Sequence, residues 1–149
     1  MIRAAALALA WLAAVGVASA GGQTPRRSIA ATAMAVASEP WFAGAGLAVT
    51  QPGSGFLRLR SVLVVGWAGS DLLSRAELLV ELVLDPRTRG WTAFAGGGVA
   101  GLLDVGGDVA GRLVLTIGAE ERPSAPRGWR IEAGLGGGMR VAAGYRFRF

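Results

Sequence analysis

The chain of 149 residues has no cysteine, no histidine and no lysine, so all fifteen positive charges are arginines. Without cysteine there is no disulfide scaffold, and without cysteine and histidine there is no zinc site of the usual kind. Without histidine the commonest general base is absent, and we expect no enzymatic activity, no cofactor and no metal site. Apolar residues make up 52% of the chain, which excludes intrinsic disorder. The length fits a single domain.

The first twenty residues have the layout of a secretory signal peptide. The start is short and basic, residues 4–17 are uncharged and apolar, and Ala18 and Ala20 stand at positions −3 and −1 of a cut after Ala20. The alternative is a retained anchor, although the apolar run barely reaches the length of about 20 residues that a membrane helix needs. Because no cysteine follows the cut, a lipoprotein is excluded. We therefore expect residues 1–20 to be removed and residues 21–149 to form the mature protein.

From residue 28 onward the chain alternates between two kinds of residue with a period of two. In the last segment, Met139 to Phe149, odd positions are apolar and end in three aromatics, whereas even positions are arginine, glycine or alanine. Such alternation indicates a β-strand that separates two different environments. The pattern also covers seven earlier segments, of which only the first has an unclear phase: 28–37, 41–50, 57–67, 75–85, 91–99, 112–120 and 129–136.

Seven turn-forming stretches rich in Gly, Pro, Ser and Asp separate the eight segments. Strands of about ten residues in an even number are what a small membrane barrel needs. Residues 71–84 are also compatible with a helix, because leucine and glutamate favour helices and Asp85-Pro86 would end one. The unbroken alternation over residues 75–85 favours a strand. We predict an all-β fold, an eight-stranded antiparallel up-and-down transmembrane β-barrel.

The chemistry of the two faces favours a membrane barrel over a soluble one. A soluble barrel would fill its interior with the large apolar face, which is too bulky for the narrow space inside eight strands. In a membrane barrel the apolar face meets lipid, and small residues with Arg–Glu pairs fill the lumen. The runner-up is a soluble periplasmic barrel that binds a ligand in an apolar cavity.

The aromatic residues give an independent indication of a membrane barrel. If both termini lie on the periplasmic side, Phe56, Trp91 and Trp129 start strands at the periplasmic rim, and Trp41 and Trp67 fall at the outer rim. Interfacial aromatics of membrane barrels gather in two such belts.

The ending Tyr145-Arg146-Phe147-Arg148-Phe149 resembles the C-terminal β-signal of bacterial outer-membrane proteins, in which apolar or aromatic residues alternate before a terminal Phe. The mature chain as a whole resembles a small eight-stranded barrel of the OmpA/OmpX type. The resemblance implies a monomer in the outer membrane of a Gram-negative bacterium, with lipid around it and the barrel-assembly machinery as its partner during insertion. Barrels of that type usually have long extracellular loops. Every connection here is short, which argues against adhesion or receptor functions.

The charged residues of the polar face are expected to point into the lumen. They are seven arginines and four glutamates: Arg58, Arg60, Glu77, Glu81, Arg112, Glu120, Arg130, Glu132, Arg140, Arg146 and Arg148. We predict that they form an ion-pair network that plugs the barrel, with Glu120 and Glu132 pairing the arginines near the periplasmic end. The expected role is structural and membrane-stabilising. The alternative is a narrow path whose excess arginine favours anions, although eight strands usually leave no open channel.

Enzymatic and nucleic-acid-binding functions have little support in the sequence. Resemblance to the small outer-membrane barrels that modify lipid A would require a catalytic histidine with serine, and the chain has no histidine. Arginines alternate with aromatics near the C-terminus like a stacking platform, but a signal peptide directs the chain away from nucleic acid. The glycine triplets at 96–98 and 136–138 lack the Lys-Ser/Thr pair and the helix of a phosphate-binding loop.

Overall fold

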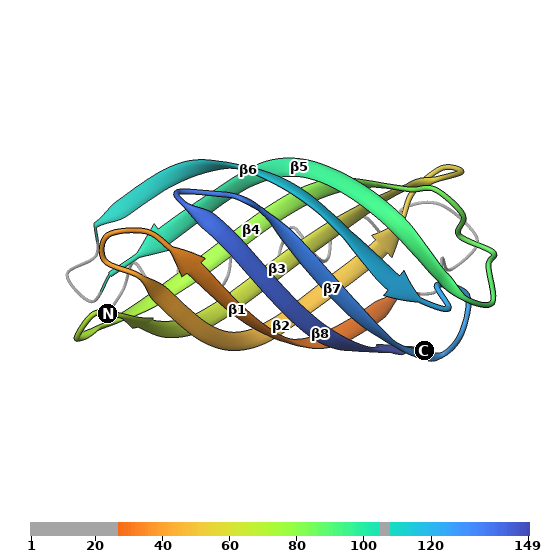
Figure 1. The fold of residues 1–149 in the computed structure, drawn as a ribbon, viewed down its shortest axis with the longest axis horizontal. Coiled ribbons are helices and arrows are strands. Elements are labelled where there is room, and N and C mark those ends of the chain that lie inside the picture. The colour runs from red at the N-terminus through yellow and green to blue at the C-terminus, as the bar shows by residue number, and fades with distance from the viewer. Residues whose placement is uncertain (1–26, 105–107) are drawn as a thin grey trace.

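The computed structural model describes residues 27–104 and 108–149, which form a β-barrel with strands tilted around its long axis (Figure 1). Its strands are β1 (Ser28–Ala37), β2 (Phe42–Pro52), β3 (Leu57–Ala68), β4 (Asp71–Val83), β5 (Trp91–Leu103), β6 (Val109–Glu121), β7 (Arg127–Leu135) and β8 (Met139–Arg148). Each strand pairs antiparallel with its neighbours in sequence, and β1 pairs with β8 to close the barrel. The predicted eight-stranded antiparallel barrel is confirmed. The predicted signal peptide, residues 1–20, lies outside the described residues.

The segment that is compatible with a helix forms strand β4. It pairs with β3 through residues 71–82 and with β5 through residues 74–83. Two complete ladders satisfy its backbone hydrogen bonds, and its alternation buries Glu77, Leu79 and Glu81 inside the barrel. Closure of the sheet therefore overrides the helix propensity of leucine and glutamate.

The phase of β1, which the sequence leaves unclear, is decided by its two neighbours. Even-numbered residues from Ser28 to Val36 are buried, and the alanines between them are exposed. Thr32 donates a hydrogen bond of 3.3 Å from its Oγ1 to the carbonyl of Ala143 on β8. The small interior residues of β1 leave room for larger side chains from other strands.

Short turns join the strands at both ends of the barrel. We call the end where β1 begins and β8 ends the terminal end, and the opposite end the distal end. At the distal end, Gly69 and Ser70 alone connect β3 to β4, and Ala68 pairs with Asp71 directly below them. Gly69 has a φ of 62°, in the left-handed region that two-residue hairpin turns use.

Glycines let the backbones of β2 and β3 approach each other closely. A Cβ atom on Gly46 would lie 1.9 Å from the carbonyl oxygen of Leu63, and one on Gly66 would lie 2.1 Å from that of Ala43. No side chain fits at these distances, so only glycine allows the two backbones to approach this closely.

The outer and inner faces of the barrel differ in chemistry. On the outside of β6, Leu113, Leu115 and Ile117 are 81%, 64% and 66% exposed. Inside the barrel, Arg60 and Glu81 are almost inaccessible to solvent, with exposures of 2% and 0%. This arrangement is the reverse of the one that a soluble barrel with an apolar cavity requires.

Candidate functional site

The alternation of five strands brings a set of charged side chains together inside the barrel, and we call this set the ion-pair network. It consists of Arg58 and Arg60 on β3, Arg75, Glu77 and Glu81 on β4, Glu120 on β6, Arg130 and Glu132 on β7, and Arg140 and Arg146 on β8. Six arginines against four glutamates leave an excess of two positive charges. All ten side chains are at most 11% exposed.

Arg130 lies at the centre of the network. Its Nη2 atom is 2.5 Å from Oε1 of Glu81 and 2.8 Å from Oε2 of Glu132. The same Glu132 oxygen accepts a hydrogen bond of 2.5 Å from Nη1 of Arg60. Charge-assisted hydrogen bonds of this kind are the strong ones in proteins. Because β4 and β7 are not neighbours in the sheet, the Arg130–Glu81 pair joins opposite walls of the barrel.

One arm of the network extends toward the terminal end. Arg58 places its Nε atom 2.7 Å from Oε2 of Glu81 and its Nη1 atom 2.6 Å from Oε1 of Glu120. Further out, Arg146 is 4.0 Å from Glu120 and donates instead to the carbonyls of the β6–β7 connection. This arm of the network therefore ends at Arg146, whose carboxylate neighbour Glu120 is distant.

The other arm extends through β8 and β4. Arg140 donates from its Nη2 atom to Glu132 at 2.7 Å and to Glu77 at 3.0 Å. Glu77 in turn accepts a 2.7 Å bond from Nε of Arg75, whose Nη2 atom donates to the carbonyl of Gly136. The chain of contacts therefore runs without interruption from Arg75 to Arg58.

Phe94 supports the centre of the network from β5. The guanidinium carbon of Arg130 lies 3.6 Å from the centre of its ring, and that of Arg58 lies 5.5 Å away. Cations over an aromatic face are attracted by the ring quadrupole, more strongly when water is excluded. The alternation of residues 91–99 places Phe94 on the polar face, but nothing in the sequence indicates that it would meet two arginines.

Most predicted lumen residues meet in the network, but Arg112 does not. It is exposed, and its Nη1 atom contacts the carbonyl of its own neighbour Gly111 at 3.5 Å. The reason is strand length: β6 pairs with β7 only from Leu115 onward, so residue 112 lies beyond the end of β7. Arg148 is half-buried at the terminal end, where its Nη1 atom donates to the carbonyl of Ser124 at 3.2 Å.

Arg75 is a network member that the list of predicted lumen residues omits. It is 1% exposed and bonds to Glu77. The signal was present in the sequence, since Arg75 has the same parity as Glu77 and Glu81 on one alternating segment.

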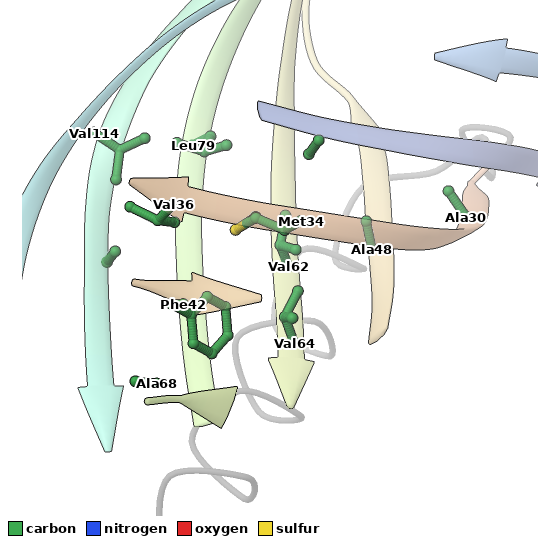
Figure 2. Packing of buried hydrophobic residues seen from close by; sticks show 12 residues of the cluster. Ala30, Met34, Val36, Phe42, Ala48, Val62, Val64, Ala68, Leu79 and Val114 are labelled. Carbon is green, nitrogen blue, oxygen red and sulfur yellow. The ribbon is translucent and has the colours of Figure 1, made fainter. Parts of the chain in front are cut away.

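Much of the remaining interior is apolar. Twelve buried residues pack together and form what we call the apolar cluster (Figure 2): Ala30, Met34, Val36, Phe42, Ala48, Val62, Val64, Ala68, Leu79, Ala100, Val114 and Ala142. Val36, Phe42 and Ala68 take it to the distal ends of β1, β2 and β3. The apolar cluster lies mainly on β1, β2 and β3 and borders the ion-pair network, since Val36 pairs with Arg140 and Val64 pairs with Arg75.

The predicted aromatic residues lie near the two ends of the barrel. Phe56, Trp91 and Trp129 are at the terminal end, Trp41 and Trp67 are at the distal end, and all are 53–58% exposed. The exposed aromatic side chains thus form one group at each end of the barrel.

The residues of the predicted β-signal continue the aromatic group at the terminal end. The ring of Tyr145 packs edge-on at 5.0 Å between Trp129 and Phe147, and Phe149 directly follows β8 and is 72% exposed. The three residues therefore face outward, on the same side of the wall as the Trp129 ring.

Within residues 27–104 and 108–149, no group of acidic side chains is arranged to hold a metal ion. No helix in this part of the chain is long and apolar enough to cross a membrane.

Comparison with known proteins identifies a fold rather than a family. No protein-family model matches the chain, and no curated protein sequence matches it significantly. The N-terminal β-barrel domain of Pseudomonas aeruginosa OprF is similar with a TM-score of 0.69 and 11% identity, over 85% of this chain and 98% of that one. A de novo designed transmembrane β-barrel has a TM-score of 0.64 and 14% identity over the same shares. For Neisserial surface protein A the values are 0.52 and 14%, over 83% and 96%.

Proposed function

We propose that the chain is an integral β-barrel protein of a Gram-negative outer membrane, monomeric, with a closed interior and a structural, membrane-stabilising role. The observation that carries this proposal is the polarity of the wall, which turns leucine, isoleucine, valine and tryptophan outward and buries charges inward. An apolar band of this kind is stable against lipid and unstable against water. The similarity to natural and designed membrane barrels supports the same conclusion.

The closed interior follows from the two sets of side chains that occupy it. The ion-pair network joins strands on opposite walls, and the apolar cluster packs mainly on β1, β2 and β3. Val62 and Val64 in the cluster and Glu81 in the network are inaccessible to solvent. Eight strands enclose a space that side chains alone can fill.

The proposal is tested by expressing the full precursor and separating inner from outer membranes. We expect a product in the outer-membrane fraction whose N-terminal residue is Gly21 and whose gel mobility in detergent changes on boiling. A soluble periplasmic product without a mobility change would overturn the membrane assignment. An intact N-terminus with outer-membrane location and heat-modifiable mobility would overturn only the predicted cleavage.

A narrow anion path is the second candidate, and the excess of two arginines inside the barrel favours it. Conductance of the refolded protein in planar bilayers separates the two functions. A structural barrel shows no conductance steps, whereas a pore shows steps with a reversal potential that favours chloride. Widening the apolar cluster by Val64→Ala should increase the steps if a path crosses it.

The barrel-assembly machinery is the proposed partner during insertion, through Tyr145, Phe147 and Phe149. Replacing Phe149→Ser should lower the amount of folded barrel in cells while leaving refolding into detergent micelles unchanged. Phe56→Ser is the matched control, because Phe56 is also exposed at the terminal end but lies outside the predicted signal. Equal assembly of both variants would exclude a role for the C-terminal residue.

A further inference from the structure

A small cavity opens at the terminal end of the barrel, and we call it the terminal cavity. Its volume is about 90 Å³, well above the roughly 10–15 Å³ that a cavity needs to hold one water molecule. Three arginines line it, Arg58, Arg146 and Arg148, together with the hydroxyl-bearing residues Ser28 and Thr50. The remaining wall consists of prolines, a glycine and apolar side chains, and none of the described lining residues is acidic.

The positive charge beside this cavity is incompletely neutralised. Arg146, 7% exposed in its side chain, has Glu120 as its carboxylate neighbour at 4.0 Å. Its shorter contacts are hydrogen bonds of 2.7–3.1 Å to carbonyls, which satisfy donors without cancelling charge. Glu120 is already paired with Arg58 at 2.6 Å and lies 3.7 Å from Arg130.

Arg58 has one hydrogen-bond donor without a partner among the described residues. Its Nε and Nη1 atoms bind Glu81 and Glu120, but its buried Nη2 atom has no hydrogen-bond partner among the described residues. A buried polar atom of this kind is destabilising unless a ligand or water satisfies it. A guanidinium presents donors in the planar geometry that phosphate oxygens accept.

The ends of the barrel also carry opposite charges. Arginines predominate at the terminal end, where Arg27, Arg87, Arg89, Arg122 and Arg127 outnumber Asp85 and Glu121. Acids predominate at the distal end, where Glu39, Asp71, Asp104 and Asp108 outnumber Arg112. Such a field raises the local concentration of anions at the terminal end.

We propose that the terminal cavity binds one phosphate group, held by the guanidinium groups of Arg58, Arg146 and Arg148. The group comes either from free phosphate or from the headgroup of an anionic phospholipid in the adjoining leaflet. The second source rests on the proposed membrane location, whereas the first does not.

The free source is tested on the full chain folded in maltoside micelles, which contain no phosphate. We expect sodium phosphate at 10 mM to raise the midpoint of thermal unfolding by about 3 °C or more relative to sodium chloride of equal ionic strength. Arg148→Gln should lose most of this shift, and Arg148 is chosen because it is half-buried and outside the ion-pair network. Arg112→Gln is the matched control, an exposed arginine near the opposite end that should keep the full shift.

The lipid source is tested in nanodiscs of phosphatidylcholine with and without phosphatidylglycerol. A midpoint that rises with phosphatidylglycerol in the wild type and the Arg112→Gln variant, but not in Arg148→Gln, assigns the site to a headgroup. If the unfolding midpoint rises with sodium phosphate in micelles but not with phosphatidylglycerol in nanodiscs, the site binds free phosphate. If both arms show no shift, or if Arg148→Gln responds like the wild type in both, the site does not bind phosphate. The location and heat-modifiable mobility of the protein are read separately, so either proposal can fail without the other.

Discussion

The interior of the barrel is divided between two kinds of contact. The ion-pair network on β3, β4, β6, β7 and β8 holds opposite walls together through salt bridges. The apolar cluster holds mainly β1, β2 and β3 together through van der Waals packing. Leu79 lies between Glu77 and Glu81 on one strand, so a single segment contributes to both. The two regions should respond differently to substitution: loss of one charge leaves its partners buried and unpaired, whereas loss of a methyl group leaves only a small void.

The largest effect is expected for Glu132→Leu in the network. Glu132 contacts Arg60, Arg130 and Arg140 at 2.5–2.8 Å, and its removal takes away the one carboxylate that all three guanidinium groups share. We expect the free energy of unfolding to fall by about 3–5 kcal/mol. Urea unfolding in micelles, followed by tryptophan fluorescence, measures it.

The control for that substitution is Glu121→Leu. Glu121 pairs with Arg122 at 2.7 Å at the surface, where an ion pair contributes about 0–1 kcal/mol. If Glu132→Leu were as mild as Glu121→Leu, the network would not hold the walls together.

A smaller loss is expected for Gly46→Ala in the wall beside the apolar cluster. The new methyl group would collide with the backbone of Leu63, and overpacking of this kind costs about 1–3 kcal/mol. Gly101→Ala on β5 is the control, since a Cβ atom there meets no other atom within 4 Å. Equal unfolding midpoints for the two variants would show that the close approach of β2 and β3 is not required.

Val62→Ala tests the apolar cluster itself. Val62 is fully buried, and the loss of two methyl groups should lower the free energy of unfolding by about 1–2 kcal/mol. The same urea titration measures it. A loss as large as that of Glu132→Leu would remove the distinction between the two regions.

The smallest effect is expected for Phe94→Leu. The substitution keeps an apolar side chain but removes the ring that faces Arg130 and Arg58, at a cost of about 1 kcal/mol. Phe42→Leu in the apolar cluster is the comparison, because no guanidinium group of the described residues lies over the ring of Phe42. Loss of the cation–π attraction predicts that Phe94→Leu is the more destabilising of the two.

Much of the barrel could be predicted from local pattern, because a strand between two environments must alternate along its own length. The alternation of residues 75–85 correctly outweighs their helix propensity, and that of residues 91–99 places Phe94 on the polar face. The same rule failed for Arg112, since alternation describes a direction and not whether a neighbouring strand is long enough to enclose the side chain. The cleavage after Ala20 and the reading of Phe149 by an assembly partner stay predictions.

The sequence by itself determined the strands, their number, the turns between them and the polarity of the two faces, because all of these depend on residues close together in the chain. The tertiary structure alone decided the phase of β1, the exposure of Arg112, and which charges meet. Arg130 contacts Glu81 because β7 and β4 face each other across the closed barrel. That proximity depends on the register and length of every intervening strand, which no local pattern encodes.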